Sequence, residues 1–170
     1  MLSYQGKVFC FGDNINTDYI ISSRRKRDTI DPEALKEFIM EDIRAGFFSE
    51  LDGTSFIVAG SNFGCGSAME VAAQILAVNN IPVVLARSFA RSFFRNCVNN
   101  GIIPLETDTG WIREGDILHI IMQESGSVLH NLSKEISVTL PPFDSTVQAI
   151  LTAGGIVSYM RLREVRGDNR

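Results

Sequence analysis

The sequence has little of several features on which common protein classes depend. Its 170 residues include only two histidines and three cysteines, so few side chains are available to form a metal site or a Ser-His-Asp triad. The cysteines are odd in number and include no Cys-x-x-Cys pair, which argues against a disulfide framework. No apolar run is long enough to span a membrane, and the N-terminus lacks the long apolar stretch that is typical of a signal peptide. We therefore expect a cytoplasmic protein.

Positive charge is not in excess either. Sixteen lysines and arginines against twenty acidic residues give a net charge of −4, so no overall positive field attracts nucleic acid. The hydrophobic share of 45% and the charged share of 21% are typical of a folded chain of this length with one core. We expect a single domain over residues 1–170 that binds neither nucleic acid nor a membrane.

The apolar segments predict an α/β fold. Short strands are expected at 7–10, 55–59, 81–86 and 102–105, and helices at 68–78 and 89–100 connect the last three strands. This order indicates right-handed crossovers and a parallel sheet. The last third of the chain differs, with short strands expected at 117–122, 128–129 and 136–140, a helix that ends at Gly154-Gly155, and a closing strand at 156–162.

The first third contains two polar segments. Residues 12–18 form a loop suited to Asx turns, and residues 19–21 are expected to be a second strand or the wall of that loop. Asp31 and Pro32 predict the N-cap and first residue of a helix that ends near Gly46. Residues 167–170 are expected to be a frayed tail.

Residues 60–67, Gly-Ser-Asn-Phe-Gly-Cys-Gly-Ser, form a glycine-punctuated loop between a buried strand and a helix. Such a turn brings unpaired backbone N–H groups to a helix N-terminus, where they favour a phosphate or a carboxylate. The loop matches neither the P-loop nor the dinucleotide-binding pattern. Ser67 is then either a reactive hydroxyl at the start of the helix or only its N-cap, and the spacing alone slightly favours the N-cap.

Four consecutive basic residues, Arg24 to Arg27, are the second candidate for a binding site. Such runs usually form a solvated surface, although arginines can also bind a carboxylate through paired hydrogen bonds. Composition alone favours the solvated surface. Asp13 and Asp18 are expected to cap turns, and Cys65 is a weak candidate nucleophile because no general base lies near it in sequence.

Six motifs occur along the chain in this order: GDNINTDYII at 12–21, NFGCGS at 62–67, ARSFA at 86–90, FRN at 94–96, NG at 100–101 and GGI at 154–156 with Tyr159. Taken together, they resemble the small subunits of 3-isopropylmalate dehydratase and homoaconitase. The resemblance implies a swivelling β/β/α domain like the C-terminal domain of aconitase. It also implies a hydro-lyase subunit that is active only with a large subunit, whose cysteines hold a [4Fe-4S] cluster, and this chain is expected to bind no metal.

The resemblance also implies roles for single residues. Ser67, as an alkoxide, would remove a proton from the carbon next to a carboxylate, and nearby amides would stabilise its negative charge. Asp18 and Asn62 would belong to the polar network of the active site.

On the substrate side, the resemblance implies contacts from Gly66 and Ala68. Arg24 or Arg27 would bind a carboxylate of a small hydroxy-dicarboxylate, by default 3-isopropylmalate in leucine biosynthesis.

The sequence departs from the family pattern after Gly66. The usual Ser-Ser-Arg-Glu-His is replaced by Ser-Ala-Met-Glu-Val at 67–71, so the arginine that normally binds a substrate carboxylate is missing. Extra basic residues at 24–27 are candidates to replace it. The departure leaves open other acids of the 2,3-dimethylmalate, citramalate or homoaconitate type, and also a non-catalytic paralogue. A stand-alone anion-binding module is a third reading.

Overall fold

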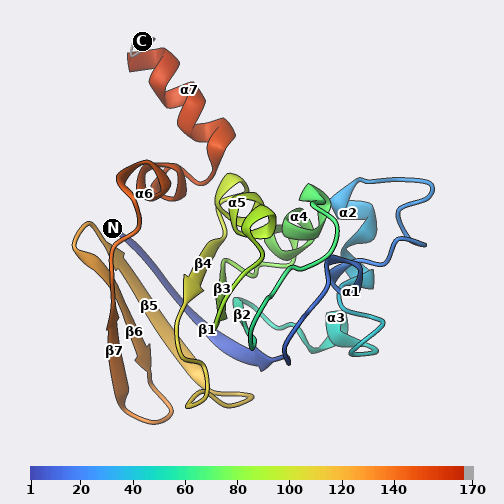
Figure 1. Ribbon diagram of the computed structural model, residues 1–170, viewed down its shortest axis with the longest axis horizontal. Coiled ribbons are helices and arrows are strands. Elements are labelled where there is room, and N and C mark those ends of the chain that lie inside the picture. The colour runs from blue at the N-terminus through green and yellow to red at the C-terminus, as the bar shows by residue number, and fades with distance from the viewer. Residues whose placement is uncertain (167–170) are drawn as a thin grey trace.

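The computed structural model describes residues 1–166 and contains a seven-stranded sheet in the order β4-β3-β2-β1-β5-β6-β7 (Figure 1). The strands are β1 Leu2–Cys10, β2 Ser55–Val58, β3 Val83–Ala86, β4 Ile103–Glu106, β5 Ile117–Gln123, β6 Gly126–Asn131 and β7 Ile136–Leu140. The helices are α1 Thr17–Ile20, α2 Pro32–Leu35, the 3-10 turn η1 Lys36–Phe38, α3 Phe47–Glu50, α4 Glu70–Val78, α5 Arg91–Asn99, α6 Ser145–Thr152 and α7 Ile156–Arg166.

Strand β1 joins the parallel half of the sheet to its antiparallel half. Its residues 7–10 pair in parallel with β2, and β2, β3 and β4 continue the parallel pairing. Its residues 2–7 pair antiparallel with β5, and β6 and β7 extend that side as a meander. The parallel arrangement expected for the strands at 55–59, 81–86 and 102–105 is therefore confirmed, as are the strand at 7–10 and the three strands of the last third.

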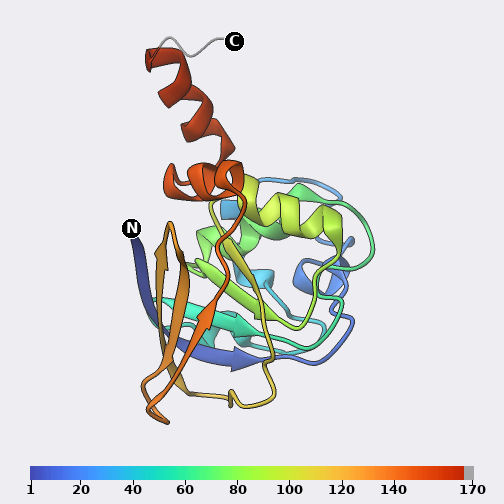
Figure 2. The same ribbon diagram turned by 60° about the vertical axis from the view of Figure 1, so that its left-hand side comes forward.

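The parallel strands are buried on both faces, which explains their almost wholly apolar sequences. Ile57 faces a core cluster shared with the helical segments before β2 and with α4, whereas Phe56 and Val58 face a second cluster shared with β5 and β6. Figure 2 shows the curled antiparallel strands on one side of the parallel strands and α4 and α5 on the other, whereas α6 and α7 pack into the cluster shared with β5 and β6. No helix within residues 1–166 is long and apolar enough to cross a membrane.

In the first third, the strand alternative for residues 19–21 and the predicted end of the helix near Gly46 are wrong. Residues 19–21 do not form a strand, because Asn16 caps the short helix α1 by accepting a hydrogen bond from the amide of Asp18. Asp31 caps α2 as expected, but the helix does not continue to Gly46. Met40 adopts a left-handed φ of 55°, and its N–H donates to the carbonyl of Ile20 at 3.0 Å.

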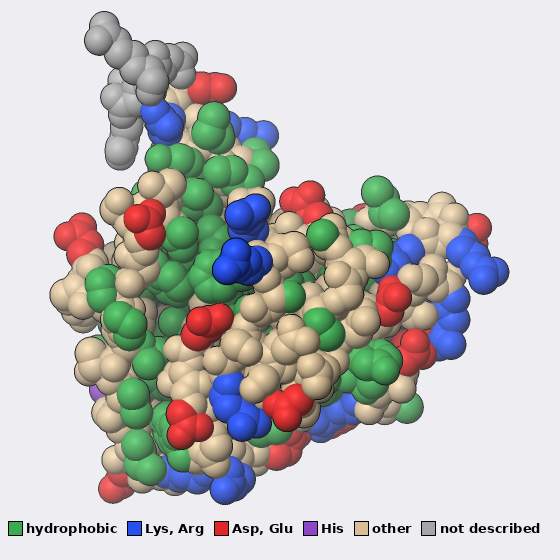
Figure 3. Space-filling model, in the orientation of Figure 1, with side chains coloured by type: hydrophobic (Ala, Val, Ile, Leu, Met, Phe, Trp, Pro, Cys, Tyr) green, Lys and Arg blue, Asp and Glu red, His purple; other side chains and the backbone are tan. Residues whose placement is uncertain are grey.

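The predicted closing strand at 156–162 is also wrong, because this segment is the helix α7. Ile156 and Tyr159 lie three residues apart, so a helix places both on one face, and both pack against the core. Figure 3 shows hydrophobic side chains gathered where α7 rises from the body, around a hollow lined by Phe143, Tyr159 and Leu162. The predicted tail at 167–170 lies outside the described residues.

Candidate active site

The candidate site lies at the carboxyl ends of parallel strands β1, β2 and β3, where the loops that follow them meet. In open α/β sheets this edge is the usual place for ligands. The amide of Gly60 donates to the carbonyl of Gly12 at 3.1 Å, and the amide of Arg87 donates to the carbonyl of Gly60 at 3.0 Å. The loop at 60–67 is thus fixed between the loops after β1 and β3.

Backbone hydrogen bonds hold the loop at 60–67 against the start of α1. The amide of Gly64 donates to the carbonyl of Ile15, and the amide of Thr17 donates to the carbonyl of Cys65, both at 2.8 Å. The buried Thr17 hydroxyl donates to the carbonyl of Ser67 at 3.0 Å. Two segments fifty residues apart in sequence therefore place Ser67 and Asp18 in one region.

Gly66 allows this close approach. Its φ is +94°, and a Cβ atom at this position would lie 2.4 Å from the Asn16 side-chain oxygen. That oxygen accepts the amide hydrogen of Asp18 at 2.9 Å and so caps α1. A residue larger than glycine at position 66 would displace the cap.

Ser67 is not the N-cap of α4, so that alternative is wrong. The helix begins at Glu70, and its N-cap residue is Met69, which makes no side-chain capping bond. The reason is a tight turn in which the Ser67 carbonyl accepts the Met69 amide hydrogen at 2.8 Å. The Ser67 side chain is exposed, and within residues 1–166 its hydroxyl has no hydrogen-bond partner. The amides of Gly66, Ser67 and Ala68 likewise donate to no described residue.

Asp18 is held as a carboxylate. Its Oδ1 atom accepts hydrogen bonds from the Ser23 hydroxyl at 2.6 Å and from the Lys26 ammonium at 3.2 Å. The pKa of Asp18 lies below its ordinary value because of the Ser23 bond first and of Lys26 second, while burial opposes the shift.

Asn62 lies in the same loop, but its bonds support the loop rather than reach Asp18 or Ser67. Its side-chain nitrogen donates to the Asn14 side-chain oxygen at 2.9 Å, and its amide donates to the Ser88 hydroxyl at 2.8 Å. Ser88 does not cap the helix that follows it, because α5 begins after Ala90 and has no side-chain cap. The reason is that the Ser88 hydroxyl is bonded to the loop at 60–67 instead.

Of the four basic residues, only Lys26 lies toward the body of the protein, and the three arginines point outward. The Arg25 guanidinium makes two hydrogen bonds to the Glu41 carboxylate, at 2.8 and 2.9 Å, and lies 3.8 Å from the Phe38 ring centroid. Arg24, which was expected to bind substrate, pairs with Glu41 and Asp42. These two arginines therefore fix the basic loop, defined as residues 22–30, to the segment that follows η1.

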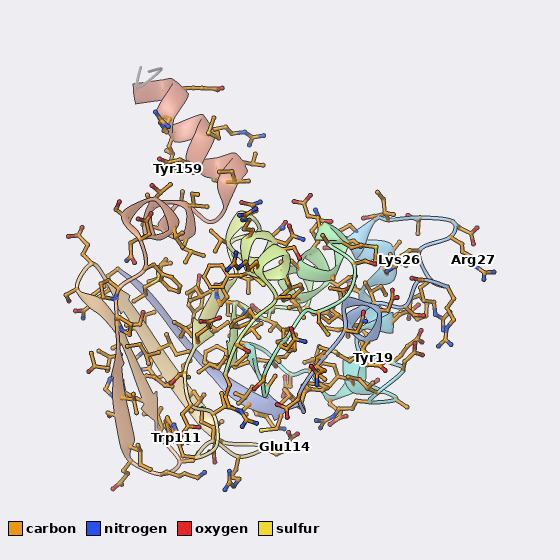
Figure 4. The ribbon with its side chains drawn as sticks, viewed as in Figure 1. Tyr19, Lys26, Arg27, Trp111, Glu114 and Tyr159 are labelled. Atoms are coloured by element: carbon orange, nitrogen blue, oxygen red, sulfur yellow. The ribbon has the colours of Figure 1, made fainter. Side chains whose placement is uncertain are left out.

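The other two basic residues point in different directions. Arg27 stands at the outer end of the basic loop, where it has no partner within residues 1–166 (Figure 4). Lys26 lies toward the body, with only 7% of its side chain exposed, and contacts Asp18 and the Met69 sulfur. Lys26 was expected only as one of the extra basic residues at 24–27 that could replace the missing arginine. Its place in a basic run was the only signal, because the run says nothing about which member points inward.

Metal-binding groups do not gather in this chain's described part. No three His, Cys, Asp or Glu side chains within residues 1–166 are placed to hold a metal ion, so these residues do not fit an iron–sulfur cluster. Cys97 is buried in the core, which raises its pKa, whereas Cys10 ends β1 and Cys65 lies in the loop at 60–67.

Comparison with known sequences gives three findings. Residues 14–110 match the model of the aconitase C-terminal domain. The chain is 39% identical over 164 residues to the 3-isopropylmalate dehydratase small subunit of Wolinella succinogenes, covering 96% of each chain. It is 38% identical over 161 residues to the methanogen homoaconitase small subunit of Methanocaldococcus jannaschii, covering 95% of this chain and 93% of that one.

The structure is similar to a crystal structure described as 3-isopropylmalate dehydratase from Methanocaldococcus jannaschii. The TM-score is 0.91 at 34% sequence identity, and the match covers 98% of each chain.

Proposed function

The chain belongs to the aconitase C-terminal domain family, and from this membership we propose that it is the small subunit of a heteromeric hydro-lyase. The fold is that family's swivelling α/β domain. The proposed reaction is that of 3-isopropylmalate dehydratase, which isomerises 2- and 3-isopropylmalate by removing and adding water in leucine biosynthesis. Support comes from near-full-length similarity to small subunits of that name. We place the protein in the cytoplasm, with no nucleic acid or membrane as partner.

The proposed partner is a large subunit that carries a [4Fe-4S] cluster. When bound there, the cluster supplies a Lewis acid for the substrate's hydroxyl and carboxylate groups. The small subunit would add the residues that take the proton and recognise the acid.

The observation that carries the proposed chemistry is the position of Ser67. Its hydroxyl is exposed and unpartnered within the described residues, at the turn where the loop at 60–67 is bonded to Thr17. In dehydration a proton leaves the carbon next to a carboxylate and hydroxide leaves the neighbouring carbon, and the two together make up the water that is lost. Ser67 as an alkoxide is the base that we propose for that proton. The free amides of Gly66, Ser67 and Ala68 supply donors for the anion or for a bound carboxylate.

The other predicted residues take supporting parts in the proposal. Asp18, an ionised group beside Ser67's turn, belongs to the polar network. Asn62 supports the loop through Asn14 and Ser88. Arg27, which has no partner within residues 1–166, remains available for a substrate carboxylate, whereas Arg24 would first have to leave Glu41 and Asp42.

Replacement of the base tests this proposal. The chain is co-expressed anaerobically with the large subunit from its own genome, and the unsaturated product is followed by ultraviolet absorbance. Ser67→Ala should lower kcat by about 10²–10⁴-fold, the usual contribution of a general base, while the complex still forms on size-exclusion chromatography. Ser125→Ala is the matched control, because Ser125 is exposed in the turn between β5 and β6. Undiminished turnover by Ser67→Ala would exclude Ser67 as the base.

A related substrate is the second candidate, because a homoaconitase small subunit is 38% identical and Ala68 and Met69 depart from the family pattern. A panel of 3-isopropylmalate, homocitrate, citramalate and 2,3-dimethylmalate separates these activities. A formed complex with an intact cluster that turns over none of the four acids would favour the non-catalytic paralogue.

A further inference from the structure

Lys26 is the one member of the basic run that lies beneath the surface of the candidate site. Its side chain is 7% exposed, and its ammonium contacts the Asp18 carboxylate at 3.2 Å and the Met69 sulfur at 3.6 Å. Met69 follows the exposed pair Ser67 and Ala68 by one residue. The ammonium is therefore placed between α1 and the turn that carries Ser67.

The hydrogen-bonding capacity of this ammonium is not used up. A lysine ammonium has three N–H donors, and a thioether sulfur is only a weak acceptor. Within residues 1–166 the Asp18 carboxylate is its one strong partner, and that carboxylate also accepts the Ser23 hydroxyl. A buried ammonium with three donors and only one strong acceptor can accommodate a further anionic ligand.

The charges around Lys26 favour an anion as well. Arg24 and Arg25 are paired with Glu41 and Asp42, so their charges are largely neutralised. Arg27 keeps an unpaired positive charge at the outer end of the basic loop. Residues 22–30 contain four basic residues and one acidic residue, Asp28, so the basic loop itself carries a net positive charge, which favours an anionic ligand.

We propose that Lys26 is a substrate-binding residue that recognises one carboxylate of the hydroxy-dicarboxylate, with Asp18 holding its ammonium in place. The inference rests on the proposed function for the identity of the ligand. Residue 69 carries no charge in this chain, so the cation in the wall next to Ala68 comes from the basic loop. Lys26 then determines specificity for an acid whose carboxylate reaches that wall.

Binding of malate and its two mono-amides to the assembled complex tests the proposal. Each mono-amide lacks the charge of one carboxylate, and calorimetry measures affinity without turnover. We expect the wild-type complex to bind malate about 10- to 100-fold more tightly than one of the mono-amides, the range for a charge-assisted hydrogen bond. Lys26→Met should remove that difference and leave the affinity for the same mono-amide unchanged.

Controls make each outcome decisive. Lys36→Met makes the same substitution at an exposed lysine paired with Glu33 and should preserve the difference. If Lys26→Met fails to assemble, the same affinity difference is measured with Lys26→Gln, which keeps a donor for Asp18.

Three results would overturn the proposal. Lys26→Met could weaken malate and both mono-amides equally, which indicates a structural role. It could lower kcat with malate affinity unchanged, which makes Lys26 a positioning residue for Asp18. The wild-type complex could also bind malate no better than either mono-amide. Failure of the wild-type complex to turn over the four-acid panel counts against the proposed function alone, because malate affinity is read without turnover.

Discussion

Replacement of Gly66 by alanine tests how the two loops of the site fit together. The glycine has a φ of +94°, and an added Cβ atom would lie 2.4 Å from the Asn16 side-chain oxygen. Asn16 cannot simply turn away, because the same oxygen caps α1 through the Asp18 amide. We therefore expect two costs, one in the backbone at position 66 and one in the lost cap.

The two costs have known sizes. A left-handed conformation costs an alanine about 1–2 kcal/mol. Loss of an asparagine N-cap costs about 1 kcal/mol. We expect Gly66→Ala to lower the free energy of unfolding by about 2–3 kcal/mol. For a chain of this length that corresponds to a fall in Tm of about 4–12 °C.

Two other glycines separate these costs in the same thermal unfolding assay. Gly46 has a φ of +78° but open space around its Cβ position, so Gly46→Ala should show the backbone cost alone. Gly12 has open space and no left-handed φ, so Gly12→Ala should leave the stability unchanged or raise it slightly. The order of Tm values should be Gly12→Ala, then Gly46→Ala, then Gly66→Ala.

A double-mutant cycle identifies the source of the additional loss. In an Asn16→Ala background the cap is already absent, so Gly66→Ala should cost only as much as Gly46→Ala. Equal losses for Gly66→Ala and Gly46→Ala in the wild-type background would refute the reasoning. So would an undiminished additional loss in the Asn16→Ala background.

Two further predictions concern charge and reactivity. The Arg25 guanidinium, and Arg24 after it, hold the pKa of Glu41 below its ordinary value of 4.5. The pair therefore stabilises the fold above that pH and ceases to do so as the pH falls through the lowered pKa, so the Tm deficit of Glu41→Gln should shrink in acid. In thiol labelling of the native protein at neutral pH, burial should protect Cys97, whose pKa it raises, and Cys65→Ser should remove the fastest-reacting thiol. A constant Tm deficit, or an unchanged fast phase, would contradict the respective prediction.

The sequence predicts the parallel half of the sheet because each buried strand there is a short apolar run between turn residues. The pattern of Phe56, Ile57 and Val58 is sufficient, since burial on both faces requires apolar residues at every position. The pattern fails at 156–162, where an irregular apolar sequence fits a strand as well as a helix. Tertiary packing of Ile156 and Tyr159 decides in favour of the helix.

The candidate site likewise has features that local sequence predicts and features that it does not. The loop at 60–67 and Asp18 are recognisable from local motifs, and the structure brings them together through Thr17. The direction of each basic side chain is not a local property. Lys26 turns inward because Asp18 and Met69 meet there, whereas its neighbour Arg25 turns outward to Glu41. Such choices depend on contacts between segments far apart in the chain.

The ion pairs of Arg24 and Arg25 bear on the entropy of substrate binding. They hold the basic loop to Glu41 and Asp42 before any ligand arrives. A loop that is already ordered loses little conformational freedom when it closes on a ligand, so more of the contact energy remains as affinity. In this sense the outward-facing arginines, which need not touch the acid at all, preorganise the inward-facing lysine for it.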